Sequence, residues 1–110
     1  MRSELPNQLE LILMLALIRL GQDAYGVRIA REIWERTGRE IPVASVYAGL
    51  SRLEKKGLVA SRVGEPTPER GGRAKVYFRI TAKGARVTRE AHFALTELAR
   101  GIPQLEGAKA

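Results

Sequence analysis

The chain has 110 residues, of which 45% are hydrophobic and 28% charged, with a formal net charge of +7 and no cysteine. This length and composition predict one soluble globular domain with a modest core. Disulfides, thiolate zinc sites and cysteine nucleophiles are excluded, and the longest apolar run, eight residues, is far below the roughly 20 that span a membrane.

The positive charge is concentrated in one segment. Seven basic and no acidic residues lie between Arg70 and Arg89, whereas the other twelve bases are balanced by the twelve acids. Such a segment attracts polyanions. The sequence therefore predicts nucleic acid as the partner, in preference to a membrane surface, which needs a helix with both an apolar and a basic face. We expect a cytoplasmic location.

Residues 8–20 are predicted to form the first helix, with Asn7 as its N-cap. Apolar side chains occur on nearly all sides of this helix, which is more than a small core needs from one element. One interpretation is that one face packs in the domain and another meets a partner subunit. The alternative is a central helix buried wholly within the monomer. At this chain length we favour the shared interface.

A second helix is predicted over residues 24–37, capped by Asp23 and ended by Gly38. Gly26 in its first turn suggests close packing against a neighbouring backbone. We interpret Trp34 as a core or interface residue in preference to a platform for a ligand.

Residues 42–56 are predicted to form the third helix, preceded by a very short strand at Ile41. Its apolar residues share one stripe, and its opposite stripe carries small side chains. The first stripe is Val46, Leu50 and Leu53, and the second is Ala44, Ala48, Ser51 and Lys55. Small side chains allow close approach to the major groove of DNA, about 12 Å wide. We interpret this segment as a recognition helix; the alternative is an ordinary surface helix with alanine chosen for helix propensity.

Two strands are predicted next, over residues 58–63 and 76–81. The segment between them, residues 64–75, is a loop rich in glycine, proline and basic side chains. A basic hairpin beside a recognition helix suits contact with the DNA backbone or minor groove. The alternative is a solvated loop whose arginines serve solubility.

A last helix is predicted over residues 82–100. Its apolar residues form a narrow seam of coiled-coil type, which together with the first helix suggests a dimer contact. The seam consists of Val87, Ala91, Ala94, Leu95 and Leu98.

Enzymatic chemistry finds little support in the sequence. The single histidine, His92, has no cysteine or carboxylate pair nearby to make a metal site or a catalytic base. The glycine-rich stretch at residues 69–73 matches neither a P-loop nor a dinucleotide fingerprint. We therefore predict no catalytic residues, no metal and no cofactor, and a chain that is not an enzyme.

Several motifs resemble those of one family, the PadR-like transcriptional regulators, across Leu9 to Leu98. They are Tyr25-Gly26, Pro42-Val43-Ala44-Ser45-Val46-Tyr47, Arg52-Leu53-Glu54-Lys55-Lys56-Gly57-Leu58-Val59 and Tyr77-Phe78-Arg79-Ile80-Thr81-Ala82-Lys83-Gly84. The expected fold is mainly α (α+β). It comprises a winged helix-turn-helix over residues 1–81 with a two-stranded basic wing, a C-terminal dimerisation helix over 82–101 and a disordered tail over 102–110.

The resemblance implies a dimeric DNA-binding repressor of the short subfamily, which pairs through its first and last helices and is often released by a small hydrophobic or aromatic ligand. We expect double-stranded DNA with a palindromic operator as its partner. The alternatives are a winged domain that binds RNA or nucleoprotein, and a protein-interaction adaptor that uses the apolar first helix. The predicted DNA-binding residues are Ser45, Tyr47, Ser51, Arg52, Lys55, Arg70, Arg73 and Lys75.

Overall fold

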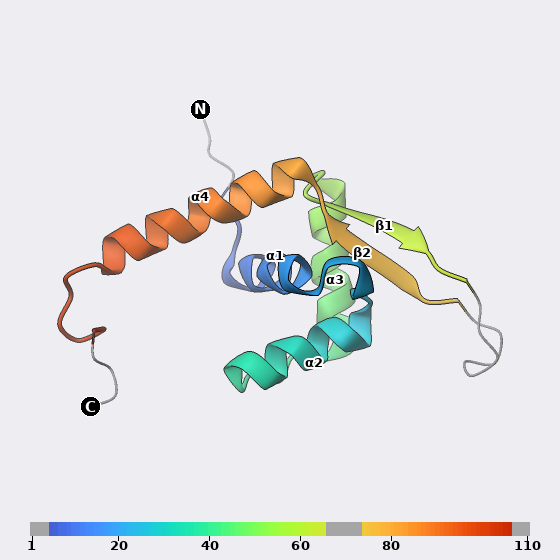
Figure 1. The fold of residues 1–110 in the computed structure, drawn as a ribbon, viewed down its shortest axis with the longest axis horizontal. Coiled ribbons are helices and arrows are strands. Elements are labelled where there is room, and N and C mark those ends of the chain that lie inside the picture. The colour runs from blue at the N-terminus through green and yellow to red at the C-terminus, as the bar shows by residue number, and fades with distance from the viewer. Residues whose placement is uncertain (1–4, 66–73, 107–110) are drawn as a thin grey trace.

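A computed structural model describes residues 5–65 and 74–106. It consists mainly of helices with one small antiparallel sheet (Figure 1). In chain order the elements are α1 Gln8–Leu20, the 3-10 turn η1 Gly21–Asp23, α2 Gly26–Thr37, α3 Val43–Lys55, β1 Val59–Val63, β2 Val76–Ile80 and α4 Ala82–Ala99. The predicted order of helices and strands is confirmed, and within the described ranges no helix is long and apolar enough to cross a membrane.

Helix α1 lies at the centre of the fold and contacts α2, α3, α4 and β2. Its predicted N-cap is confirmed, because the Asn7 side chain accepts a hydrogen bond from the Glu10 backbone N–H at 2.8 Å. The Glu10 carboxylate accepts one in return from the Asn7 backbone, which completes a capping box. The helix ends at Gly21, whose φ of 62° favours glycine.

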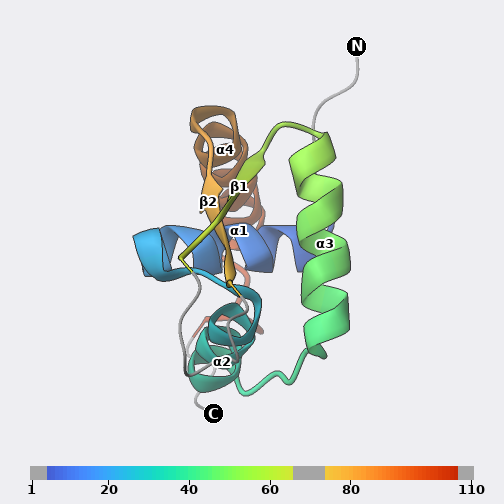
Figure 2. The same ribbon diagram turned by 90° about the vertical axis from the view of Figure 1, so that its right-hand side faces the viewer.

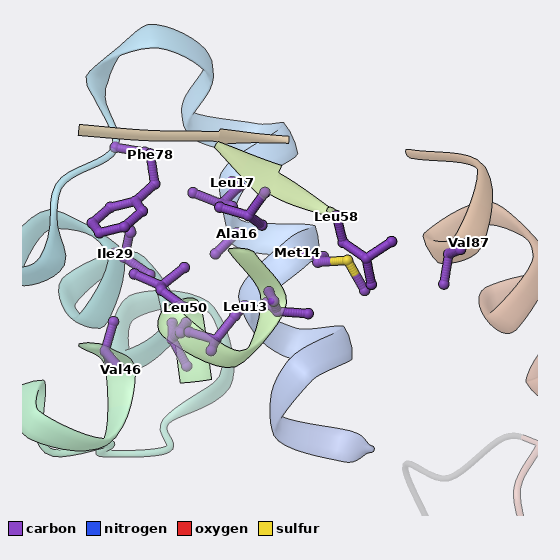
Figure 3. Close-up of a cluster of buried hydrophobic side chains, with 14 residues drawn as sticks. Leu13, Met14, Ala16, Leu17, Ile29, Val46, Leu50, Leu58, Phe78 and Val87 are labelled. Carbon is purple, nitrogen blue, oxygen red and sulfur yellow. The ribbon is translucent and has the colours of Figure 1, made fainter. Parts of the chain in front are cut away.

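The core forms where the helices meet the inner face of the sheet (Figure 3). Burying one large apolar side chain in this core stabilises the fold by about 1.5–3 kcal/mol of transfer free energy. The labelled contributors are Leu13, Met14, Ala16 and Leu17 from α1, Ile29 from α2, Val46 and Leu50 from α3, Leu58 and Phe78 from around the sheet, and Val87 from α4. The alternative of a wholly buried α1 is wrong for this chain, because Leu15 and Ile18 are exposed.

Two local expectations around α2 are wrong. The N-cap residue is Tyr25, and Asp23 instead lies in η1, where its carboxylate is 3.8 Å from the Arg28 guanidinium. Gly26 packs against a side chain, that of Tyr47, and not against a backbone. Trp34 is 53% exposed, so of the two places expected for it the core is ruled out, and a place at an interface stays a prediction.

The strands β1 and β2 pair antiparallel, from Val59 opposite Ile80 to Val63 opposite Val76. A third extended segment, at Tyr25 just before α2, pairs with β2 through an isolated bridge. The short strand predicted at Ile41 is wrong, because residues 38–42 form a loop. Tyr25 forms a bridge with Tyr77, and the Phe78 backbone N–H donates to the Ala24 carbonyl at 2.8 Å. The hairpin therefore stands on the start of α2 and projects from the helical body as a wing (Figure 1).

Helix α4 follows β2 after one residue, Thr81, whose side chain caps it by accepting from the Gly84 backbone N–H. Its first half is buried through Val87, Thr88 and Ala91, and its second half extends away from the body (Figure 1). Residues 103–106 form turns, and residues 107–110, part of the tail expected to be disordered, lie outside the described residues.

Candidate nucleic-acid interface

Helix α3 is amphipathic in the way its sequence predicts. Val46, Leu50 and Leu53 are completely buried against the body of the protein. The opposite stripe, Ala44, Ala48, Ser51 and Lys55, is exposed along the whole helix. Thirteen residues give a helix about 20 Å long. One side of α3 is therefore a narrow surface of small side chains, of a width that the major groove admits.

The wing lies beside this helix. Helix α3 contacts β1. Figure 2 shows the molecule from the right-hand side of Figure 1, and α3 and both strands lie on the side that faces the reader. The free end of α4 points to the opposite side (Figures 1 and 2). The structure thus brings Ser45, Tyr47, Ser51, Arg52 and Lys55 onto one element that neighbours the hairpin.

Tyr47 is held firmly although it is 42% exposed. Its ring lies against Gly26, where an added Cβ atom would come within 2.6 Å of Tyr47 Cε2. The centre of the same ring lies 6.1 Å from that of Phe78. Ser45, two residues closer to the start of α3, is half-buried. The aromatic side chain that the sequence predicts to meet DNA is therefore fixed by packing before any ligand binds.

Arg52 and Lys56, near the end of α3, share a buried carboxylate that sequence reasoning missed. Glu10 of α1 is only 2% exposed, and Lys56 Nζ donates to its two oxygens at 3.1 and 3.3 Å. Arg52 Nε lies 3.5 Å from Glu10 Oε2. Arg52 and Lys56 remain about half exposed, so both reach from a buried anion to the surface.

The pKa of Glu10 is set by opposing effects. Burial raises it, but hydrogen bonds from the Asn7 backbone and from Lys56, the charge of Lys56 and a contact with Arg52 together hold the pKa below its ordinary value of 4.5. Glu10 is therefore ionised at neutral pH. The sequence signal for its capping role is Asn7 followed three residues later by Glu10. Its pairing with Lys56, 46 residues away, has no local signal.

Two cations flank a pair of aromatic rings at the base of the wing. Lys75 Nζ lies 4.0 Å from the centre of the Tyr25 ring, and the Arg62 guanidinium carbon lies 4.5 Å from that of Tyr77. The two tyrosine rings meet edge to face at 5.6 Å. Arg62, which the sequence analysis did not single out, thus belongs to the same basic surface as the predicted Lys75.

The tip of the wing is outside the described residues, and Arg70 and Arg73 lie there. Beyond the wing, the exposed Lys83, Arg86 and Arg89 continue the basic segment along α4. Within residues 5–65 and 74–106, no group of three or more His, Cys, Asp or Glu side chains is placed to hold a metal ion.

Comparison with known proteins gives consistent matches. A model of the transcriptional regulator PadR-like family matches residues 14–90. A PadR family transcriptional regulator from Eggerthella lenta is 30% identical, with a TM-score of 0.67 over 87% of this chain and 81% of that chain. An uncharacterised protein from Lysinibacillus sphaericus is 40% identical over 67 residues, so the chain spans 59% of the length of this curated relative.

A more distant match has the same fold. F93 from STIV, a winged-helix DNA-binding protein, is 18% identical, with a TM-score of 0.69 over 89% of this chain and 98% of that chain. At this identity the match shows the fold alone, which is a winged helix.

Proposed function

Because the chain belongs to the PadR-like family of transcriptional regulators, we propose that it is a homodimeric repressor that binds double-stranded DNA in a sequence-specific way. One observation carries this proposal: the small-residue stripe of α3 is exposed along its length beside a basic wing. A helix that served only as surface would have no need of a fixed tyrosine and a basic hairpin next to it.

In this proposal α3 enters the major groove. Ser45 and Tyr47 contact phosphates or base edges near the start of the helix, and Arg52 contacts a guanine or a phosphate further along. Ser51 and Lys55 line the same exposed face. Lys75, with Arg70 and Arg73 beyond the described residues, contacts the backbone or the minor groove.

The proposed dimer uses the apolar side chains that the single chain leaves exposed. Leu15 and Ile18 of α1 are partly exposed, and Phe93, Leu95 and Leu98 project from the free half of α4. Exposed leucines on two adjacent helices favour burial by a second copy. A dyad through this surface would offer two α3 helices to successive major grooves about 34 Å apart on a palindromic operator.

Repression, release by a small hydrophobic or aromatic effector, a cytoplasmic location and the absence of enzymatic activity complete the proposal. Transcriptional regulators are not a class of enzyme.

The experiment is selection of bound fragments from a library of random duplexes, followed by equilibrium binding at several salt concentrations. The expected result is an inverted repeat, bound with an affinity that falls linearly on a log–log salt plot with a slope near −0.9 per neutralised phosphate. Preference for single-stranded RNA would instead support the RNA-binding alternative. Absence of binding to any nucleic acid would support the adaptor.

A further inference from the structure

The cluster of Glu10, Arg52 and Lys56 places an anion at the edge of the proposed DNA surface. A carboxylate in that position repels phosphates, so taken without its two cationic partners it would weaken binding to any nucleic acid. Its two cationic partners stand on α3 and at its C-cap, whereas Glu10 itself lies in the first turn of α1. Two helices distant in sequence therefore meet through one buried charge at the recognition element.

The contact geometry suggests what the carboxylate does to Arg52. Arg52 Nε lies 3.5 Å from Glu10 Oε2, so one edge of the guanidinium faces the carboxylate. An arginine held by Nε keeps its two terminal nitrogens for another partner, and those nitrogens form the fork that pairs with O6 and N7 of guanine. Lys56 is held more directly, since its ammonium donates hydrogen bonds to both Glu10 oxygens.

We propose that Glu10 is a positioning residue for sequence recognition: it orients Arg52 for base contact and restrains Arg52 from general attachment to phosphates. The inference rests on the function proposed above. Glu10 is nearly completely buried and touches no DNA itself; it acts through Arg52. An arginine whose orientation is set before binding loses less freedom on contact and discriminates better between bases.

The chain contains a matched control in Glu32 of α2. Its carboxylate also collects cations, with Arg36 Nε at 3.1 Å, Arg19 Nε at 3.3 Å and Arg28 Nη1 at 3.4 Å. None of these four residues belongs to α3 or the wing. Glu32→Gln changes the net charge as Glu10→Gln does, and it breaks a comparable cluster away from the proposed interface.

The experiment measures dissociation constants for the duplex selected by the wild-type protein and for a scrambled duplex of the same composition. Glu10→Gln keeps an oxygen that can accept the Asn7 N–H, so the cap of α1 is retained. The ratio that matters is the dissociation constant for the scrambled duplex divided by that for the selected duplex. We expect this ratio to fall about tenfold in Glu10→Gln, partly because the variant binds the scrambled duplex more tightly. In Glu32→Gln the ratio should stay within about twofold of wild type.

A second arm separates positioning from a general structural role. In an Arg52→Ala background, adding Glu10→Gln should change the ratio no further, because Arg52 is the side chain through which Glu10 acts. Should Glu10→Gln fail to fold, Glu10→Asp retains the charge and withdraws it by one methylene, and its ratio should also fall.

The outcomes are distinct. An unchanged ratio in the folded Glu10 variant, or a fall that persists without Arg52, overturns the positioning role and leaves the DNA-binding proposal intact. A wild-type protein that selects no duplex sequence refutes both proposals.

Discussion

The ring of Tyr47 on α3 lies directly against Gly26 at the start of α2, with no room between them for a side chain. This contact joins the two helices of the helix-turn-helix at the point where α3 begins. It also explains a glycine in the first turn of a helix, where glycine costs about 1 kcal/mol relative to alanine.

Gly26→Ala is therefore expected to destabilise the protein by about 1–3 kcal/mol, the usual cost of forcing a methyl group into a packed site. Because Tyr47 must move, binding to the selected duplex should weaken as well. Urea unfolding and equilibrium binding measure the two effects. In a Tyr47→Ala background the obstacle is gone, and Gly26→Ala should add little further cost. Fully additive effects would contradict the contact.

Ala48→Glu tests the exposed stripe of α3. Since Ala48 is exposed, the free energy of unfolding should change by no more than about 0.5 kcal/mol. Binding to the selected duplex should weaken at least about tenfold, because a carboxylate would face the phosphates. Gln104→Glu makes the same change of charge in the turns after α4, at the end of the molecule opposite the wing (Figure 1). Equal effects of the two substitutions would argue against docking through α3.

Arg52→Ala and Arg73→Ala are expected to differ in kind. Arg73 belongs to the part of the wing outside the described residues, and its loss should weaken binding to all duplexes alike and reduce the salt slope by about 0.9. If Arg52 contacts a base, its loss should reduce the differences in affinity among operator variants. A binding panel over single-base variants distinguishes the two patterns. Uniform weakening by both substitutions would refute base reading by Arg52.

Leu95→Asp tests the proposed dimer. The side chain is exposed in the single chain, so the fold of the monomer should be retained while a buried carboxylate disrupts the pairing of α4. Sedimentation equilibrium should give a dimer for the wild type and a monomer for the variant. Val63→Asp places the same charge on an exposed apolar residue of the wing and should leave the dimer intact. A dimeric Leu95→Asp protein would place the contact elsewhere.

Stability should depend on pH through Glu10. Its pKa is lowered on folding, so its contribution to the free energy of unfolding is complete above the ordinary value of 4.5 and is lost as the pH falls through the lowered value. Wild-type stability should therefore fall in this acidic range more steeply than that of Glu10→Gln. Urea unfolding between about pH 3 and pH 6 measures both slopes. Parallel curves would mean that the carboxylate gains nothing from its partners.

Much of the fold was predictable because its signals are local. Asn7 and Gly21 delimit α1, and the spacing of Val46, Leu50 and Leu53 gives both the extent of α3 and its buried face. These features depend on capping and on the helical repeat, which a short stretch of sequence contains.

The misses concern contacts between distant segments. Nothing near Glu10 predicts Lys56, and nothing near Tyr25 predicts its bridge to Tyr77, which places this segment, and not Ile41, beside the two strands of the wing. Asp23 has the chemistry of an N-cap, but the bridge sets the start of α2 at Tyr25. Arg62 was passed over because its role depends on a ring across the hairpin.

Thr81, the residue between β2 and α4, is held against the segment that leads into β1. Its N–H donates to the Leu58 carbonyl at 3.1 Å, its hydroxyl donates to the Gly57 carbonyl at 2.8 Å, and a Cβ atom on Gly84 would overlap the same Leu58 carbonyl oxygen. The junction between β2 and α4 is therefore tightly packed, and the two elements are expected to move together. In the proposed dimer, a ligand that changed the angle between the two α4 helices would therefore also change the positions of the two hairpins. Release from DNA would then need no further moving element between the ligand and the wing.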